Sequence, residues 1–280
     1  MKKHPIKYYI KNYSPIVLGF PTLTIFSFIF IANATKFNVY RLLSVLIERI
    51  TGFQLPNNII LTNKYVLSVI FCSVLFAVFV YSLRKCYSDS IFHDDSNYYD
   101  DDPFFIFYIA QLCGFKKINP INIPIWIQIK LVLKTNFKFD FREYNNTDEK
   151  GEIKKFNFRK DIHQDEFNVI LEDTYPISAE MISKENNNLP SVKIRRGHFK
   201  PGSHLYNKWF VEQFSQNIDS LIRQNPRRLN FYCSTNPAHT YDIFKNLLDR
   251  MSRQSNISIY VYQPQEQNNQ FFYNEGHKIM

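Results

Sequence analysis

The chain has 280 residues, a formal net charge of +9 and a hydrophobic fraction of 45%, and its mean hydropathy is −0.28. These values exclude a protein that lies mostly within a bilayer, while the length leaves room for a membrane portion and one ordinary domain. The four cysteines have no paired spacing, which argues against a disulfide framework and a zinc site and agrees with a reducing cytoplasm.

Residues 13–35 form the first predicted membrane span because they contain no charged side chain. At about 1.5 Å per residue the segment covers about 34 Å, which exceeds the roughly 30 Å of a hydrocarbon core. The lysines before it and the small residues at Ala32 and Ala34 also resemble a secretory signal with a cleavage site. The apolar run is longer than such a signal requires, so we expect a transmembrane helix.

Residues 65–83 form the second predicted span, bounded by Lys64 on one side and by Arg84 and Lys85 on the other. Two spans place both ends of the chain on one side of the membrane. The basic residues before the first span and after the second favour the cytoplasm for that side, although basic residues in the connecting loop weaken the contrast. We therefore expect a multi-pass membrane region over 1–90, with both termini cytoplasmic.

The connection between the spans and the segment after them are also distinctive. Apolar residues in 37–50 recur at helical spacing, which fits either an amphipathic helix on the membrane surface or a loop helix packed on the spans. The segment 91–102 contains HDDSNYYDDD, whose spacing matches no known metal site and predicts an acidic solvated linker. A cytoplasmic sensor domain is expected over 103–280, opening with a short helix at 103–113 that is interfacial or part of the core.

The first half of this domain is predicted to be rich in strands. Apolar and polar residues alternate through 121–133, and the alternation resumes at 137–144. Turn-forming residues at 145–151 predict that 153–158 returns antiparallel to 137–144. A further strand is expected at 167–172.

The last third alternates between helix and strand periodicity. An amphipathic helix is expected at 205–221 and a strand at 228–234. Pro237 opens a second helix that extends to Met251, and a strand follows at 257–262. This strand, helix and strand predict a βαβ unit with a right-handed crossover. The fold class is therefore an α/β (or α+β) cytoplasmic domain with an N-terminal two-helix transmembrane hairpin.

A ligand site is expected where the strands of such an open sheet end, at Ser234–Thr240, where helix amides can receive an anion. Between Lys193 and Arg253 there are eleven Lys or Arg against four Asp or Glu. This excess fits a nucleotide, a phosphorylated signal or single-stranded nucleic acid, and it equally fits solvated surface or attraction to anionic headgroups. No Gly-rich phosphate motif is present. The candidate ligand-binding residues are Arg195, Arg196, Lys200, Arg227, Arg228, Asn236 and His239.

No catalytic residue, metal ligand or cofactor is predicted. His163 with its neighbouring aspartates, and Ser203 beside His204, lack a base, a nucleophile and an orienting group in a recognised spacing. His239 and Asp242 lie one turn apart on the helix after Pro237, where helix capping and a core contact account for them. We expect the protein not to be an enzyme.

The complete layout consists of a short basic N-terminus, two apolar helices, an acidic linker and a cytoplasmic domain. It resembles the two-transmembrane effectors of bacterial anti-phage defence systems, and in particular the membrane effector of certain retrons. That resemblance implies inhibition by a reverse transcriptase with its RNA-DNA product, and damage to the inner membrane once the restraint is released. Related architecture occurs in effectors gated by a cyclic nucleotide. No diagnostic motif carries the resemblance, so it assigns no functional residue.

The sequence therefore favours a non-enzymatic membrane effector, a toxin whose homo-oligomerised spans disturb the lipid bilayer while its cytoplasmic domain senses a nucleic acid or nucleotide. Neither predicted span contains an ionisable residue, which argues against a transporter. Two alternatives stay open. One is a membrane-anchored adaptor or nucleotide-binding protein without pore activity, and the other is a membrane-anchored enzyme.

Overall fold

The structure is a computed structural model, and it describes residues 45, 48, 49, 52, 64–92, 104–141, 145–158, 164–197, 205–251, 256–267 and 270–280. For Lys64–Cys72, Leu75, Phe104, Phe105, Gln267 and Gln270 it describes the backbone alone. The predicted first span, most of the segment 37–50, the core of the acidic linker, His163, Lys200, Ser203 and His204 lie outside these residues. The chain divides into two compact units, Met1–Asp89 with Ile109–Phe115 and Ser90–Tyr108 with Lys116–Met280.

In the first unit, helix α5 (Lys64–Tyr87) contains the second predicted span. Among the residues whose side chains are described, no helix is both long enough and apolar enough to cross a membrane. Helix α6 (Phe104–Leu112) confirms the short helix expected there. The turn after it contains Gly114, which has a φ of 105° and lies so close to α5 that an added Cβ would come within 2.5 Å of the Arg84 Cα.

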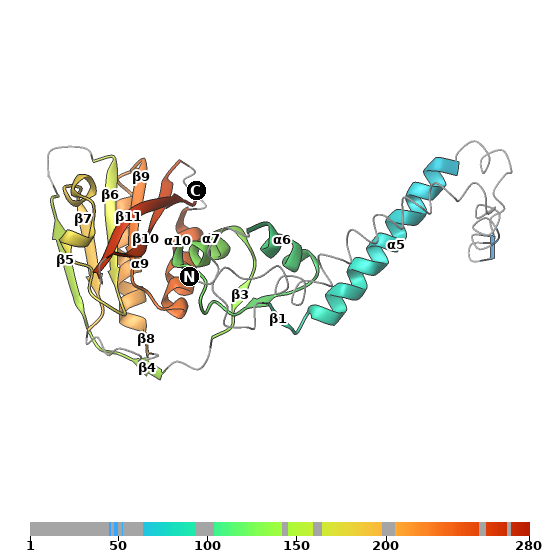
Figure 1. The fold of residues 1–280 in the computed structure, drawn as a ribbon, viewed down its shortest axis with the longest axis horizontal. Coiled ribbons are helices and arrows are strands. Elements are labelled where there is room, and N and C mark those ends of the chain that lie inside the picture. The colour runs from blue at the N-terminus through green and yellow to red at the C-terminus, as the bar shows by residue number, and fades with distance from the viewer. Residues whose placement is uncertain are drawn as a thin grey trace. The chain divides into compact units, whose positions relative to one another are not determined.

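The second unit is built on a sheet with the described strand order β11-β10-β9-β6-β7-β5 (Figure 1). Four neighbouring strands run parallel, and the two outer strands pair antiparallel to them. The parallel strands are β10 (Ser258–Gln267), β9 (Arg228–Cys233), β6 (Glu166–Glu172) and β7 (Ser191–Arg195), and the outer ones are β11 (Gln270–Lys278) and β5 (Glu152–Phe156). This arrangement confirms a mixed α/β domain.

Short strands and helices complete the unit. Strands β1 (Ile91–Phe92), β2 (Lys117–Ile118) and β3 (Lys138–Phe139) form a small parallel sheet, and β4 (Asn145–Thr147) pairs in parallel with β8 (Leu205–Asn207). The helical segments are α7 (Ile125–Lys134), the 3-10 helix η1 (Ala179–Met181), α8 (Lys184–Asn187), α9 (Lys208–Ile222) and α10 (Pro237–Met251).

The two faces of the main sheet are buried by different layers. On one face Phe231 of β9 lies 6.4 Å from Phe214 of α9 and 5.0 Å from Phe244 of α10, measured between ring centroids. On the opposite face Tyr232 stacks on Tyr262 at 4.6 Å, within a cluster that includes residues of β6, β11 and the segment around η1. Both faces are therefore apolar, as expected of parallel strands covered on two sides.

A buried amide pair crosses the centre of the sheet. Asn168 of β6 and Asn230 of β9 lie directly opposite each other and are both 0% exposed. The Asn230 Nδ2 donates to the Asn168 Oδ1 at 3.3 Å, and the Asn168 Nδ2 donates to the Asn186 carbonyl oxygen at 2.6 Å. These bonds satisfy polar groups that would otherwise destabilise the core.

The strands and helices predicted for the last third are present, although β10 extends beyond the expected 257–262 and β11 was not predicted. Strand β9, helix α10 and strand β10 form the expected βαβ unit with β9 and β10 parallel. The expected strand at 167–172 is β6, and the helix expected at 205–221 is α9. Leu205 belongs instead to β8, because the side chain of Asn207 accepts from the Phe210 N–H and caps α9 at that point.

The expected strand at 121–133 is wrong, since the described residues Ile125–Lys134 form helix α7. Six of its residues are buried, including Gln128, whose Nε2 donates to the carbonyl oxygens of Pro120 and Ile123. A short apolar segment buried on most sides has no distinct helical or strand period, so the alternation of isoleucines was not informative. Pro124, immediately before the helix, was the better indicator of a helix start.

The expected antiparallel pairing of 153–158 with 137–144 is also wrong. Strand β5 pairs antiparallel with β7, and β3 pairs in parallel with β2. The first three residues of the expected turn at 145–151 form strand β4 instead, and turn-forming residues do not select which strand the chain pairs with after them. Gly151 accounts for the true pairing, because an added Cβ would lie 1.8 Å from the Arg195 carbonyl oxygen at the end of β7.

Candidate ligand site at the carboxyl edge of the sheet

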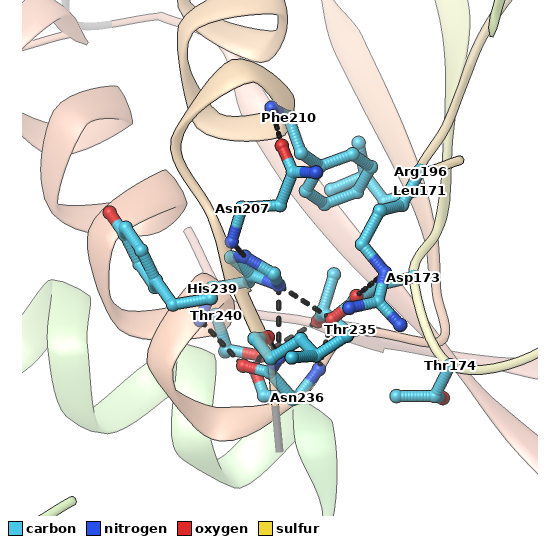
Figure 2. Close-up of polar contacts among 12 residues, drawn as sticks. Leu171, Asp173, Thr174, Arg196, Asn207, Phe210, Thr235, Asn236, His239 and Thr240 are labelled. Carbon is cyan, nitrogen blue, oxygen red and sulfur yellow. Dashed lines mark hydrogen bonds and ion pairs between the residues drawn. The ribbon is translucent and has the colours of Figure 1, made fainter. Parts of the chain in front are cut away.

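Polar and charged side chains collect where three parallel strands of the main sheet end. Asp173 follows β6, Arg196 follows β7 and Ser234 follows β9. Asn236 and Pro237 then open helix α10. The carboxyl edge of an open parallel sheet is the usual place for a ligand, and Figure 2 shows Asp173, Arg196 and Asn236 converging there.

The Asp173 carboxylate lies at the centre of this group and is 0% exposed. Its Oδ2 accepts from the Asn236 backbone N–H at 2.8 Å and from the His239 Nδ1 at 2.7 Å. Because Asn236 and His239 flank the start of α10, the carboxylate sits where the positive end of the helix dipole favours a negative charge. The anion position expected at this helix is therefore occupied by the protein's own carboxylate.

The contacts of His239 determine its tautomer. The Asn207 backbone N–H donates to the His239 Nε2 at 2.7 Å, so Nε2 carries no hydrogen. The proton is then on Nδ1 and is donated to Asp173. The Asn236 Nδ2 lies 3.0 Å from the same His239 nitrogen, but it donates to the Leu205 carbonyl oxygen at 3.1 Å. The imidazole is neutral and 0% exposed. With both nitrogens engaged, His239 cannot serve as a general base for a substrate.

Asn207 extends the network to helix α9. Its Oδ1 accepts from the Phe210 N–H at 2.9 Å (Figure 2). Its Nδ2 donates to the Glu149 carbonyl oxygen at 2.8 Å. The rings of Tyr206 and Phe210 lie 5.0 and 5.2 Å from the His239 ring. One chain of contacts thus connects the end of β6 with the first turns of α10 and α9.

Arg196 is 3% exposed and pairs with Asp173, with 3.0 Å between the Arg196 Nε and the Asp173 Oδ1. The distance is short, but the N–H does not point at the oxygen, so the contact is an ion pair without a hydrogen bond. The Arg196 Nη1 also has no hydrogen-bond partner. Among the described residues this edge therefore contains a buried guanidinium with unused donors.

A second buried carboxylate lies one residue earlier, on the opposite face of the sheet. The Glu172 Oε1 accepts from the Ile177 N–H at 2.6 Å and lies 2.6 Å from the Lys193 Nζ. The Lys193 Nζ also donates to the Ile177 carbonyl oxygen at 2.7 Å. The Arg195 Nε is 4.0 Å from the Glu172 Oε2, with 43% of the Arg195 side chain exposed. The Lys193 ammonium is therefore held by internal contacts, whereas the Arg195 side chain extends to the surface.

Tyr206 is the last member of this group and contacts helix α10 near its start. Its hydroxyl donates to the Asp242 Oδ2 at 2.6 Å. Burial raises the pKa of Tyr206 well above its ordinary value, and the hydrogen bond to Asp242 raises it further. The phenol stays protonated and holds Asp242 as an acceptor throughout the physiological range.

The residues predicted from the sequence fall on two opposite edges. Arg195, Arg196, Asn236 and His239 gather at the carboxyl edge, in agreement with the expected position. Arg227 and Arg228 precede and begin β9 and therefore lie at the amino edge. Lys200 lies outside the described residues.

The two arginines at the amino edge have other contacts. Arg227 is largely exposed and its Nε lies 3.6 Å from an oxygen of Asp165. The Arg228 guanidinium lies 3.9 Å from the Tyr260 ring centroid and donates to the Asn230 Oδ1 and the Tyr262 hydroxyl. The structure therefore places these two candidate residues away from Arg195 and Arg196, at the other edge of the sheet.

Sequence reasoning did not identify Asp173, Asn207 or Tyr206. Asp173 was detectable, because an aspartate directly after the buried strand at 167–172 is a frequent site residue in parallel sheets. Asn207 had only the weaker signal of a helix-capping residue before an amphipathic segment. Within the described part of the chain, no group of three or more His, Cys, Asp or Glu could hold a metal ion.

The fold was compared with solved structures. Two structures of the Acinetobacter baumannii Cap4 receptor, which contains a SAVED/CARF domain, match with TM-scores of 0.40 and 0.42 at 12% sequence identity. One structure contains 3'3'3'-cAAA and the other 2'3'3'-cAAA. The matches cover 60% and 63% of this chain but only 41% of the receptor chain.

Comparisons of sequence give one family. A search of the curated proteins finds no significant match. The family model described as the SMODS- and Ubiquitin system-associated 2TM effector domain matches residues 7–280, nearly the whole chain. The match includes both predicted spans and the α/β domain, and it agrees with the expected resemblance to two-transmembrane defence effectors without indicating the retron type. The chain belongs to the SMODS- and ubiquitin system-associated 2TM effector family of anti-phage defence systems.

Proposed function

We propose that this chain is a non-enzymatic effector of the bacterial inner membrane, whose α/β domain binds a nucleotide and thereby controls membrane damage by the two predicted spans. Family membership over residues 7–280 supports the two-span architecture, and the uncharged segments 13–35 and 65–83 support it independently. The sensor is the carboxyl edge of the sheet, and the effector is a homo-oligomer of the spans.

The buried arginine at the carboxyl edge is the observation that carries this proposal. Arg196 is 3% exposed, and neither its Nε nor its Nη1 has a hydrogen-bond partner among the described residues. A buried donor without an acceptor destabilises a fold, and a ligand that supplies the acceptor recovers that free energy. Ligand binding at this edge is therefore thermodynamically coupled to the end of β7 and to the start of α10.

Binding is tested on the full-length protein in detergent by isothermal titration calorimetry. The titrants are cyclic dinucleotides, cyclic trinucleotides and a short RNA-DNA hybrid, the last representing the product of a reverse transcriptase. We expect a cyclic nucleotide to bind and Arg196→Gln to weaken it at least about tenfold, because a charge-assisted hydrogen bond is lost. Arg227→Gln at the opposite edge is the matched control and leaves binding unchanged.

The outcomes separate the ligand classes. Binding of the RNA-DNA hybrid alone, with an affinity that falls steeply as salt rises, would assign the trigger to a reverse transcriptase product. Binding of all titrants with equal affinity in wild type and Arg196→Gln would contradict the assignment of this edge as the sensor.

Membrane damage is tested by inducing the protein in bacterial cells together with an enzyme that makes the nucleotide found to bind. We expect a potential-sensitive dye to report depolarisation in the wild type and not in Arg196→Gln at equal protein abundance. An intact potential in both strains would favour a membrane-anchored adaptor, and would contradict the effector proposal.

A further inference from the structure

Three buried polar atoms without hydrogen bonds meet at one contact of the carboxyl edge. Among the described residues they are the Asp173 Oδ1, the Arg196 Nε and the Arg196 Nη1. The first is an acceptor and the other two are donors, and the Oδ1 and the Nε are 3.0 Å apart. The contact therefore offers an unused acceptor directly beside unused donors, as the neighbouring side chains in Figure 2 show.

This pairing discriminates between the parts of a nucleotide. A phosphate presents acceptors only, so it satisfies Arg196 but faces the negative charge of Asp173 at the same point. The edge of a nucleobase presents a donor beside an acceptor, as in the amino group and ring nitrogen of adenine. Such an edge donates to the Asp173 Oδ1 and accepts from Arg196.

We infer that the Asp173–Arg196 pair is a nucleobase-recognition site, which reads the hydrogen-bonding edge of a base and not the phosphate of the nucleotide. This inference rests on the proposed function, since it specifies which part of the bound nucleotide the carboxyl edge contacts. The phosphates then lie outside the pair.

Both partners are held in position by other bonds. The Asp173 Oδ2 is fixed by the Asn236 N–H and the His239 Nδ1, which orients the Oδ1 toward Arg196. The Arg196 backbone N–H donates to the Glu172 carbonyl oxygen at 2.8 Å. A rigid acceptor beside a planar guanidinium suits a flat, bidentate partner, and a lysine cannot reproduce that geometry.

The experiment uses full-length protein in detergent and measures affinity by calorimetry. The titrants are cyclic dinucleotides and trinucleotides of adenosine, guanosine, cytidine and uridine, together with inorganic phosphate and the abasic analogue of each ring. We expect base-bearing rings to bind roughly tenfold or more tightly than their abasic analogues, and inorganic phosphate not to compete. Equal affinity for abasic and base-bearing rings would overturn the inference, although nucleotide binding itself would stand.

Two variants add an independent comparison. Arg196→Lys keeps the positive charge but loses the fork of donors, so we expect the affinity for the base-bearing rings to fall roughly tenfold or more. Arg227→Lys is the matched control, with less than a twofold change expected. Retention of wild-type affinity by Arg196→Lys would show a simple charge contact and overturn the inference. Failure of every ring to bind the wild type would instead refute the proposed function.

A third measurement is independent of any effect of mutation on folding. Base-modified rings are titrated into wild-type protein, with purine replacing adenine and with inosine replacing guanosine, so that a single exocyclic amine is removed. We expect loss of the amine in the preferred ring to weaken binding by roughly tenfold, because the Asp173 Oδ1 then loses its donor. Unchanged affinity for all modified rings would contradict a role for Asp173 in base recognition.

Discussion

His239 accepts the Asn207 backbone N–H at its Nε2 and donates from its Nδ1 to the Asp173 Oδ2, each at 2.7 Å. Asn207 caps α9, His239 lies in the first turn of α10, and Asp173 follows β6. A single neutral imidazole therefore joins two helix starts to one strand end. Because the imidazole makes both contacts, its removal affects both helix starts and the strand end at once.

Removal of the imidazole is expected to be costly. In His239→Ala the Asn207 N–H and the Asp173 Oδ2 each lose a buried partner, so the free energy of unfolding falls by about 3 kcal/mol. The measurement is urea denaturation of the detergent-solubilised chain, followed by circular dichroism. Lys208→Gln, with 74% of the lysine side chain exposed, is the control and changes stability by less than about 0.5 kcal/mol. A loss below about 1 kcal/mol in His239→Ala would refute the bridging role.

Asn207 makes two side-chain bonds that substitution can separate. Asn207→Ala removes both the cap on the Phe210 N–H and the bond to the Glu149 carbonyl oxygen, and lowers stability by about 2 kcal/mol. Asn207→Ser retains a capping oxygen but is too short to reach Glu149, so it recovers about half of that loss. Thermal unfolding of the two variants gives the difference, and equal melting temperatures would argue that the side chain contributes through one bond only.

Gly151 and Gly197 provide a comparison of close packing at the edge of the site. A Cβ at Gly151 would lie 1.8 Å from the Arg195 carbonyl oxygen and 2.8 Å from the Trp209 ring, whereas one at Gly197 would lie 3.2 Å from the Lys150 carbonyl oxygen. Gly151→Ala must therefore displace β5 from β7 and is expected to cost about 3 kcal/mol, against about 1 kcal/mol or less for Gly197→Ala. Hydrogen exchange of the β7 amides, faster in Gly151→Ala alone, identifies the strand that moves.

Alkaline pH is expected to destabilise the domain through its buried tyrosines. The pKa of Tyr175 is raised above its ordinary 10.0 by burial, and burial also raises that of Tyr273, whose hydroxyl lies 3.1 Å from the Tyr175 hydroxyl. The folded state holds protons that the unfolded state releases, so the stabilisation is complete below about pH 10 and is lost as the pH rises above it.

The measurement for this prediction is phenolate absorbance, recorded together with circular dichroism between pH 9 and 12. We expect part of the absorbance to appear only as the domain unfolds. Tyr273→Phe removes one of the buried phenols and reduces the dependence of the unfolding free energy on pH. Complete ionisation of all tyrosines while the dichroism stays native would contradict the prediction.

The sequence predicted best where one physical signal decided the structure. Strands β6 and β9 and helices α9 and α10 have strong periodicity and clear start signals, such as Pro237, and they form as expected. The segment 125–134 has apolar residues on most of its surface, so its alternation was ambiguous. The antiparallel return of 153–158 failed because strand pairing depends on contacts distant in sequence, which local turn chemistry does not specify.

The site was predictable to the extent that it depends on strand ends. Asn236 and His239 were found because they follow a strand and open a helix. Arg228 was grouped with residues of the carboxyl edge, but it begins β9. The start of a parallel strand lies at the edge of the sheet opposite its end, so Arg228 lies at the amino edge. In the sequence, His239 is 66 positions from Asp173 and 32 positions from Asn207. Such pairings arise only from tertiary structure and leave no local pattern in the sequence.

The amide pair between Asn168 and Asn230 has a consequence for the accuracy of assembly. A slip of β9 along β6 by two residues would keep every apolar side chain on its own face, so hydrophobic burial alone does not forbid it. It would, however, oppose an asparagine to an isoleucine or a tyrosine and break the hydrogen bond between the two carboxamides. The hydrogen bond between the two asparagines therefore favours the observed register of β9 against β6. The same register brings Asp173 within hydrogen-bonding distance of the Asn236 N–H.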